Sequence, residues 1–562
     1  MEILDWIVIG TFFVALIGII LWVTRSKQNN SADYFLGGKS ATWIAIGASI
    51  FASNIGSEHL IGLAGAGASS GMAMAHWEIQ GWMILILGWV FVPFYSRSMV
   101  YTMPEFLERR YNPQSRTILS VISLVSYVLT KVAVTVYAGG LVFQQVFGIK
   151  ELWGIDFFWI AAIGLVLLTA IYTIFGGMKS VLYTSILQTP ILLIGSLIIL
   201  VLGLKALGGW DEMMKICSAV QVNDYGNSMT DLIRSNKDAN FPWAGALLGS
   251  AIIGFWYWCT DQFIVQRVLS GKDEKQARRG SIFGAYLKLL PVFLFLIPGM
   301  IAFALHQKYI GTGGFLPLLS DGTPNADAAF PTLVAKLLPA GIKGLVVCGI
   351  LAALMSSLAS LFNSSAMLFT IDFYKRLKPK TSEKKLVHIG QIATVVIVVL
   401  GILWIPIMRS IGNVLYTYLQ DVQSVLAPGI AAAFLLGITW KRTSAKGGMW
   451  GLISGMIVGL TRLGAKVYFT NVLNAPDSLF KYLFYDVNWL FFCGWMFLFC
   501  IIVVVIVSLF TKAPSEEKIQ GLVFGTSTPE QKLATRKSWN KWDVINSIII
   551  LGITAAFYWY FW

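Results

Sequence analysis

The chain has 562 residues, of which 56% are hydrophobic and 12% are charged, and its mean hydropathy is +0.71. Soluble chains carry about 45–50% apolar and about 25% charged residues, so this composition excludes a string of soluble domains and indicates a polytopic membrane protein. The formal net charge of +14 resembles a nucleic-acid signal, but its distribution along the chain is better explained by membrane topology.

Apolar segments long enough to cross a bilayer follow one another along the whole chain. A spanning helix needs about 20 such residues. Fourteen spans are predicted, at 5–24, 42–66, 77–96, 117–145, 157–175, 180–204, 243–266, 281–305, 343–371, 387–408, 412–439, 447–465, 487–510 and 542–562. The first has no basic segment before it and no evident cleavage site after it, so we expect a retained span rather than a signal peptide.

Lysine and arginine are distributed unequally between the two sets of loops. One set holds 28 of the 42 basic residues and the opposite side holds 12. The richer set is 25–41, 97–116, 176–179, 267–280, 372–386, 440–446 and 511–541. Because cytoplasmic loops are enriched in Lys and Arg, this set is predicted to be cytoplasmic, and both termini then lie outside. The expected location is the plasma membrane, or the inner membrane of a bacterium.

Two spans contain polar runs that are unusual for contact with lipid. The second span contains residues 53–59 (SNIGSEH), and the seventh contains residues 256–262 (WYWCTDQ). A helix that is broken where it lines a cavity would accommodate such runs. Small-residue packing is the alternative for the second span, and an interfacial aromatic belt is the alternative for the seventh.

The positions of these two spans suggest an internal repeat. With the second span counted as the first core helix, the seventh is the sixth, and a five-plus-five inverted repeat has its discontinuous helices at these positions. The predicted units are a first helix and loop (1–40), repeat 1 (41–208), repeat 2 (209–440) and three accessory helices with a polar loop at 511–541 (441–562).

Isolated polar groups in other spans point to binding chemistry. Glu78 opens the third span, and Lys288 in the eighth either snorkels to the interface or pairs with a buried acid. Ser356 and Ser357 in the ninth span either bond back to their own helix or join free carbonyls in a hard-oxygen cage suited to sodium. Gln420 stands close to Tyr416 in the eleventh.

Several long blocks resemble the sodium/glucose cotransporters of the solute:sodium symporter family. They include SNIGSEHLIGLAGAG (53–67), WYWCTDQFIVQR (256–267) and LMSSLASLFNSSAMLFTIDFY (354–374), and the similarity runs from DYFLGGKS (33–40) to YLQDVQSVLAPGI (418–430). The resemblance implies an all-α polytopic protein of about 14 helices with a LeuT-like 5+5 core, one helix before it and three after. It also implies sodium-coupled import of a glucose- or galactose-like hexose by alternating access.

The resemblance also implies particular binding residues. Sodium is expected at the carbonyls of Ala52, Ile55 and Ala353 and at the hydroxyls of Ser356 and Ser357. The sugar is expected at His59, Glu78, Tyr257, Trp258, Lys288 and Gln420, with an outer gate at Leu63 and Tyr416.

Three positions depart from the family pattern. Ser185 stands where an Asp is usual near a second sodium site, and Ala359 replaces a hydroxyl residue of two-sodium members. One sodium ion per sugar is therefore predicted. Gly254 stands where a polar sugar contact is common, which leaves the hydroxyl preference open.

Other functions are alternatives to hexose symport. A polyol such as myo-inositol would need nearly the same side chains, and a transport-poor sugar sensor would share the site. A channel would need an open conduction path, which broken helices and bulky gates disfavour. A membrane enzyme using Glu58 and His59 lacks an accompanying nucleophile, base and orienting group, so no enzymatic activity is expected. The expected partners are the small-molecule sugar, sodium and the lipid bilayer, and no nucleic acid.

Overall fold

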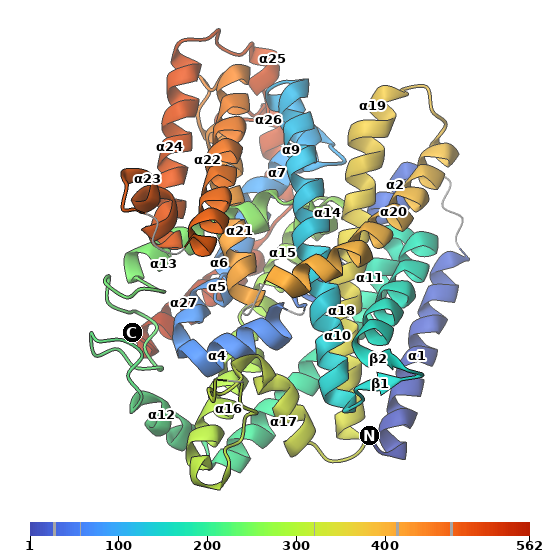
Figure 1. Ribbon diagram of the computed structural model, residues 1–562. Coiled ribbons are helices and arrows are strands. Elements are labelled where there is room, and N and C mark those ends of the chain that lie inside the picture. The colour runs from blue at the N-terminus through green and yellow to red at the C-terminus, as the bar shows by residue number, and fades with distance from the viewer. Residues whose placement is uncertain (26–29, 57, 320, 412–414, 473–475) are drawn as a thin grey trace.

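Helices make up most of the chain because a backbone inside a membrane must satisfy its hydrogen bonds within its own segment. Figure 1 shows this bundle in a computed structural model, which describes all residues except 26–29, 57, 320, 412–414 and 473–475. Labels with η mark short 3-10 or π-helical turns that interrupt or extend the α-helices.

The elements of the first 156 residues are helical except for a small antiparallel hairpin at their end. They are α1 (Ile3–Thr24), α2 (Ser31–Leu36), η1 (Gly37–Lys39), α3 (Trp43–Asn54), η2 (Glu58–Leu63), α4 (Ala64–Ser70), η3 (Gly71–Met74), α5 (Ala75–Glu78), α6 (Gly81–Ile86), η4 (Leu87–Phe91), α7 (Val92–Ser98), α8 (Met103–Arg110), α9 (Pro113–Ser126), η5 (Tyr127–Val132), α10 (Ala133–Phe147), β1 (Glu151–Leu152) and β2 (Ile155–Asp156).

The remaining elements are helical. They are α11 (Phe157–Leu207), α12 (Trp210–Ser218), α13 (Trp243–Gly254), η6 (Phe255–Thr260), α14 (Gln262–Leu269), α15 (Glu274–Lys288), η7 (Val292–Leu296), α16 (Ile297–Lys308), η8 (Ile310–Thr312), η9 (Ala326–Ala328), α17 (Ala329–Leu337), α18 (Ile342–Met367), η10 (Leu368–Tyr374), α19 (Lys375–Leu377), α20 (Glu383–Ile411), α21 (Leu415–Thr439), α22 (Ala445–Asn471), α23 (Leu479–Lys481), η11 (Tyr482–Asp486), α24 (Trp489–Leu509), α25 (Glu516–Ile519), α26 (Pro529–Lys537) and α27 (Lys541–Tyr560).

The all-α architecture expected from the sequence is confirmed. Within the described residues, ten helical stretches are long and apolar enough to cross a membrane. Each of the fourteen predicted spans overlaps helical structure, but some are interrupted and two run together in α11. The number of membrane crossings and the 5+5 repeat therefore stay predictions.

The long helix α11 is two arms joined at Gly177. This glycine has φ 53° and ψ −149°, and a Cβ there would overlap the carbonyl oxygen of Tyr34, so no other residue fits without strain. Ser180 Oγ donates to the carbonyl of Tyr172 at 3.1 Å, although a straight helix would separate these residues by about 12 Å. The chain therefore turns back at Gly177, between the two predicted spans 157–175 and 180–204.

Both predicted helix breaks are confirmed. The α3 helix ends at Asn54, because Ile55 has extended angles (φ −77°, ψ 110°), and helical structure resumes in η2. In the seventh predicted span the break falls at Asp261 (φ −77°, ψ 126°), whose side chain caps α14 by accepting from the backbone N–H of Phe263. Each break leaves backbone groups inside the bundle rather than at its surface.

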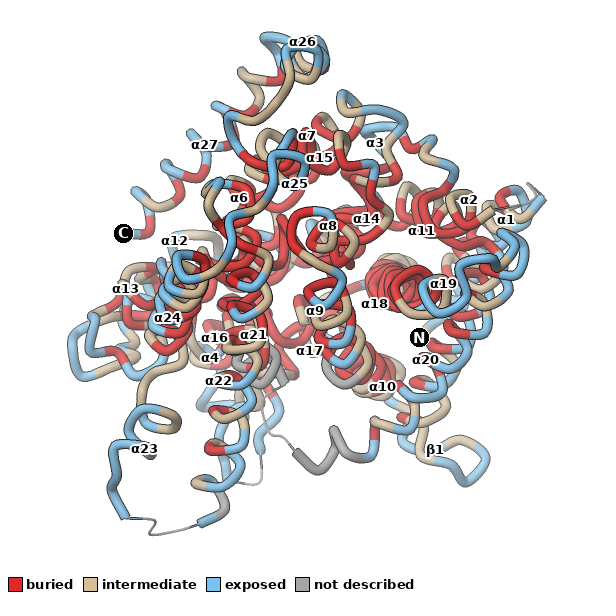
Figure 2. Tube along the Cα trace, turned by 90° about the horizontal axis from the view of Figure 1, so that it is seen from above, coloured by how far each residue is buried: buried red, intermediate tan, exposed pale blue. Residues whose placement is uncertain are grey.

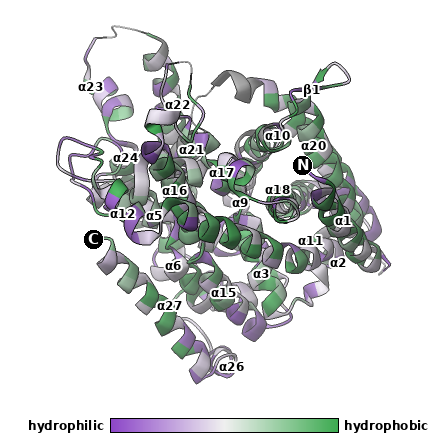
Figure 3. Ribbon diagram, turned by 90° about the horizontal axis from the view of Figure 1, so that it is seen from below, coloured by the Kyte–Doolittle hydropathy of each residue, from purple (hydrophilic) through white to green (hydrophobic). Residues whose placement is uncertain are grey.

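The bundle has a buried interior and an apolar outer face. Figure 2 shows buried residues along α18 and the inner helices, and exposed residues toward the outside. Figure 3 shows hydrophobic residues along the outer helix α1. On α24, Trp495 is 67% exposed and apolar, which is typical of a surface that faces lipid.

The loops fall into two groups that match the predicted sides of the membrane. In Figure 1, α2, α19, α25 and α26 lie at one end, while β1, β2 and α12 lie at the other. Hydrogen bonds join members of the same group, as between Arg97 and Ser527, or between Ser31 and Glu383. The side chain of Asp5 accepts from Gly341, and Phe561 accepts from Leu232, so both termini lie with the second group. Which group faces the cytoplasm stays a prediction from the charge distribution.

Candidate functional site

The break after α3 lies against the polar part of α18. Ser356 Oγ donates to the carbonyl oxygen of Ala52 at 2.6 Å and to that of Ala353 at 2.9 Å. A Cβ on Gly56 would lie 3.1 Å from Ser357 Oγ, so this second hydroxyl faces the break itself. The structure thus gathers Ala52, Ala353 and both serines, which the sequence predicted as sodium ligands.

This cluster offers neutral, hard oxygen atoms. Helix ends leave carbonyl groups without helical partners, and Ile55, the fifth predicted ligand, is fully buried in the break. Among the described residues there is no cluster of three His, Cys, Asp or Glu side chains that could bind a metal ion. An ion at this break would be held by carbonyls and hydroxyls, which suit a hard cation of low charge.

The hydroxyls next to this cluster already have partners. Ser360 Oγ lies 2.6 Å from Ser53 Oγ, so these two groups hydrogen-bond to one another. Ser185 Oγ donates to the carbonyl of Val181, in its own helix, at 2.6 Å. Ala359 is fully buried and presents only a methyl group. A hydroxyl that donates keeps its lone pairs, so what this region lacks for a second cation is an oxygen atom at Ala359 and a carboxylate at Ser185.

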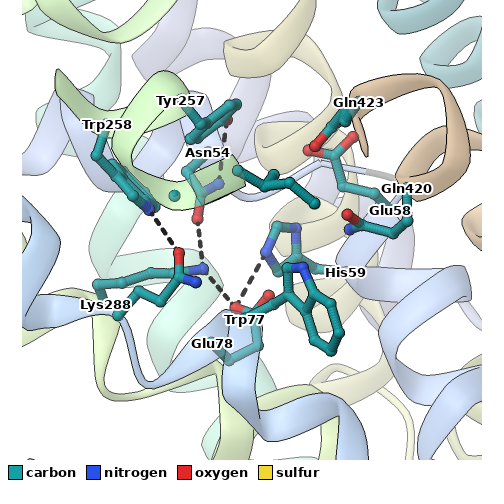
Figure 4. Close-up of a pocket in the computed structure, with 13 residues that line it drawn as sticks. Asn54, Glu58, His59, Trp77, Glu78, Tyr257, Trp258, Lys288, Gln420 and Gln423 are labelled. Atoms are coloured by element: carbon teal, nitrogen blue, oxygen red, sulfur yellow. Dashed lines mark hydrogen bonds and ion pairs between the residues drawn. The ribbon is translucent and has the colours of Figure 1, made fainter. Parts of the chain in front are cut away.

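A cavity lies beside the break and contains all six residues predicted to bind sugar (Figure 4). It encloses about 480 Å³ of space not occupied by atoms, part of it open to solvent. It is lined by Asn54, Glu58, His59, Trp77, Glu78, Gln80, Ile253, Gly254, Tyr257, Trp258, Lys288, Gln420 and Gln423. The lining comes from the two broken helices, from α5, α15 and α21, and from the turn after α5.

A chain of charged and polar contacts crosses the cavity wall. Lys288 Nζ lies 2.5 Å from Glu78 Oε2 and 3.1 Å from Asn54 Oδ1. His59 Nε2 lies 3.3 Å from the same Glu78 oxygen, and Asn54 Nδ2 donates to the Tyr257 hydroxyl at 3.1 Å. Lys288 is 3% exposed, so it pairs with a buried acid rather than snorkelling. Asn54 lies between the ion pair and Tyr257 in this chain.

Other polar atoms at the cavity lack a partner. Within the described part of the chain, His59 Nδ1, Trp77 Nε1 and Gln420 Oε1 are buried and make no hydrogen bond. Leaving such a group unsatisfied costs about 1–3 kcal/mol. Hydroxyl groups of a ligand both donate and accept, so a polyhydroxylated molecule could satisfy all three atoms.

Sequence reasoning missed part of the lining and did not place the gate. Asn54 and Glu58 belong to the polar run 53–59, but Trp77 and Gln80 carry only one signal, their closeness in sequence to Glu78. Leu63 is fully buried and is absent from the cavity lining. The side chain of Tyr416 lies outside the described residues, so the outer gate stays a prediction.

A second buried ion pair lies behind Tyr257. Lys131 Nζ is 2.7 Å from Asp261 Oδ2, and both side chains are almost completely buried. The ammonium group also lies 4.7 Å from the centre of the Tyr257 ring, and the Tyr127 hydroxyl donates to Asp261. This pair links η5 to the break before α14. Because isolated charges are very unfavourable inside a membrane, loss of either partner would be costly.

Comparison with known proteins identifies relatives along most of the chain. The profile of the family described as "Sodium:solute symporter family" matches residues 34–455. Sodium/myo-inositol cotransporter 2 of Homo sapiens is 38% identical over 539 residues, which are 93% of this chain and 79% of that protein. The mouse (Mus musculus) protein of that name is 39% identical over 543 residues, 94% of this chain and 80% of the relative.

A third relative and two solved structures extend this result. The sodium/myo-inositol cotransporter of the dog (Canis lupus familiaris) is 36% identical over 552 residues, with 93% and 76% coverage of the two chains. A Na+-coupled sialic acid symporter in a substrate-bound outward-open state has a TM-score of 0.74 at 21% identity, covering 92% of this chain and 99% of its own. MhsT in complex with L-phenylalanine has a TM-score of 0.51 at 14% identity, with 84% and 98% coverage. At these identities the two structures show the fold alone, and they confirm the LeuT-like architecture.

The first prediction concerns the oxygen cluster at the break. Replacing Ser356 and Ser357 together with Ala removes two oxygen atoms, each worth about 1–3 kcal/mol to a desolvated cation. We expect sodium to bind at least tenfold more weakly, measured as the sodium-dependent change in tryptophan fluorescence of the purified protein. Ser365→Ala, a buried serine about two turns further along α18, is the control and should bind sodium normally. Unchanged sodium affinity in the double variant would place the ion elsewhere.

The second prediction concerns the pair behind Tyr257. Asp261→Asn retains a capping side chain for α14 but deprives the buried Lys131 ammonium group of its hydrogen-bonded carboxylate. Breaking such a pair costs about 3–5 kcal/mol, so the thermal midpoint of the detergent-solubilised protein should fall clearly.

The matched control is Lys131→Met combined with Asp261→Asn, which removes both charges. It should recover most of the lost thermal stability, because the Lys131 charge is then removed together with its hydrogen-bonded partner. Equal midpoints for the single and double variants would show that the two charges do not depend on each other.

Proposed function

The chain belongs to the sodium:solute symporter family, and from that premise we propose that it transports a cyclic polyol, with myo-inositol as the leading substrate. The sequence alone led us to expect a hexose. The relatives described above are sodium/myo-inositol cotransporters, so the alternative substrate considered from the sequence is now the better one. Sodium is the coupling ion of this family.

One observation carries the choice of a polyhydroxylated substrate. Glu78, Lys288 and Asn54 form a buried polar wall, and unpaired polar atoms of His59 and Gln420 face the same cavity. A carboxylate accepts hydrogen bonds from two hydroxyls in a charge-assisted way, and the amide and imidazole can donate or accept. The aromatic rings of Tyr257 and Trp258 in the lining would provide apolar surface for the C–H groups of a sugar or cyclitol ring.

The coupling between sodium and substrate would run through the break after α3. Ala52 and Ile55, the proposed carbonyl ligands, flank Asn54, which contacts both Lys288 and Tyr257. A sodium ion would order this short segment and so fix Asn54 and His59 for substrate. Substrate binding would then allow the cavity to close outward and open inward, with the two breaks as hinges. The protein would act as a multi-pass plasma-membrane symporter without enzymatic chemistry, its core formed by residues 41–208 and 209–440.

The third prediction tests transport. Proteoliposomes with an inward sodium gradient should accumulate myo-inositol, and should take up glucose and galactose less well. Glu78→Gln removes a charge-assisted acceptor worth about 1.5–3 kcal/mol, so the apparent KM for the substrate should rise tenfold or more.

The control for this experiment is Glu517→Gln, an exposed acid on α25 that should transport normally. Uptake of glucose ahead of every inositol would return the assignment to a hexose. Sodium-dependent binding without uptake would indicate a sensor.

The fourth prediction concerns stoichiometry. Ser185 provides a hydroxyl where a carboxylate would offset the charge of a second sodium ion, and Ala359 offers no oxygen, so we propose one sodium ion per substrate molecule. The voltage that nulls net substrate flux in proteoliposomes reports the coupling ratio, because each transported charge contributes about 2.3 kcal/mol per 100 mV. A null voltage that fits two sodium ions would contradict this proposal.

A further inference from the structure

Gln80 lies in the turn between α5 and α6 and reaches across to α13 and η6. Its Nε2 donates to the carbonyl oxygen of Ser250 at 2.8 Å, and its Oε1 accepts from Trp258 Nε1 at 3.3 Å. The residue is 3% exposed and belongs to the cavity lining. Because both ends of the amide are engaged, its orientation in the cavity wall is fixed.

Gly254 provides the space that Gln80 occupies. A Cβ on Gly254 would lie 2.5 Å from Oε1, 2.9 Å from Cδ and 3.1 Å from Nε2 of Gln80. The glycine has ordinary helical angles (φ −62°, ψ −40°), so its backbone does not require glycine, and an interior glycine costs a helix about 1 kcal/mol relative to alanine. The reason for a glycine here is therefore steric. It lies one turn from Ser250 and one turn from Trp258, the two partners of Gln80.

The fixed amide keeps hydrogen-bonding capacity for a ligand. A primary amide has two N–H donors and two lone pairs on its oxygen, and the contacts to Ser250 and Trp258 use one of each. One donor and one acceptor remain, which matches the two roles of a hydroxyl group. At the same time the Gln80 amide fills the volume next to Gly254, so the cavity has little depth beside this glycine.

We propose that Gln80 is a specificity-determining residue, which favours cyclitols over hexopyranoses. A cyclitol such as myo-inositol has a hydroxyl on every ring carbon, whereas glucose carries a hydroxymethyl group that extends one carbon further. The Gln80 amide pairs with a ring hydroxyl and occupies the space that the hydroxymethyl group needs. A pocket that hydrogen-bonds a substrate group rejects a poorly matched analogue more strongly than an apolar pocket does. This inference rests on the proposed polyol symport.

The test measures the ratio of the myo-inositol and glucose affinities, with sodium present. Binding to the purified protein is followed by tryptophan fluorescence, since Trp77 and Trp258 line the cavity. Gln80→Ala should weaken myo-inositol binding about fivefold to tenfold and strengthen glucose binding, so the ratio falls at least tenfold. Gln80→Met keeps the volume without the hydrogen bonds, and should weaken myo-inositol binding while glucose stays excluded.

A second pair of variants tests the steric link to Gly254. Gly254→Ala should weaken binding of both ligands, because the new methyl group displaces the Gln80 amide. Combining it with Gln80→Ala should bring glucose binding to about the level of Gln80→Ala alone, because the methyl group then has room. Gln391→Ala is the matched control, because this amide also donates to a distant backbone carbonyl, that of Ile174, but lies outside the cavity lining, and it should leave the ratio within about twofold. A merely structural role for Gln80 would change the thermal midpoint and both affinities together.

Two failures are distinguishable. If wild-type protein binds neither ligand in a sodium-dependent way, the proposed polyol function is wrong and the role of Gln80 falls with it. If wild type binds myo-inositol but Gln80→Ala and Gln80→Met both keep the wild-type ratio, the function stands and Gln80 does not determine specificity.

Discussion

The architecture depends on one constraint: a backbone that leaves helical geometry inside a membrane must find its partners within the protein. At Ile55 and at Asp261 the helices break, and neither break faces lipid. The first is covered by α18, whose Ser356 donates to the Ala52 carbonyl, and the second is capped by its own Asp261 side chain. The cavity forms between these two breaks because that is where polar backbone and polar side chains can share an interior space.

The same constraint explains two ion pairs in the core. Glu78 and Lys288 form one pair at the cavity, and Lys131 and Asp261 form another behind Tyr257. A single charge in this environment would be very unfavourable, whereas a hydrogen-bonded pair is tolerated without adding much stability. Tyr257 lies between the two pairs, in contact with Asn54 on one side and with Lys131 on the other. Movement of one broken helix against the other would therefore disturb contacts at the cavity.

The cavity wall also shows how closely related substrates could be distinguished with few changes. Carboxylate, ammonium and amide groups suit any polyol, so Glu78, Lys288 and Gln420 define a class of ligand rather than one molecule. The shape of the cavity has to provide the selectivity between individual polyols. Where Gln80 fills the space beside Gly254, the cavity wall is polar and leaves little room for a ligand. A small difference in shape between two ring compounds then decides whether a substituent makes a hydrogen bond or a steric clash there.

The sequence by itself determined the membrane class and the all-α fold through its composition, and both helix breaks through the local runs 53–59 and 256–262. The family resemblance implied six of the residues that line the cavity, and the others were missed. It also placed Ser356 and Ser357 with the carbonyls of the first break, where the structure gathers them. Only the tertiary structure decided that Lys288 pairs with Glu78, that Lys131 pairs with Asp261, and that Gln80 excludes a side chain at position 254. Each of those contacts joins residues more than a hundred positions apart. Local patterns show which side chains are too polar for lipid, but only the packing of distant helices decides which partner satisfies each of them.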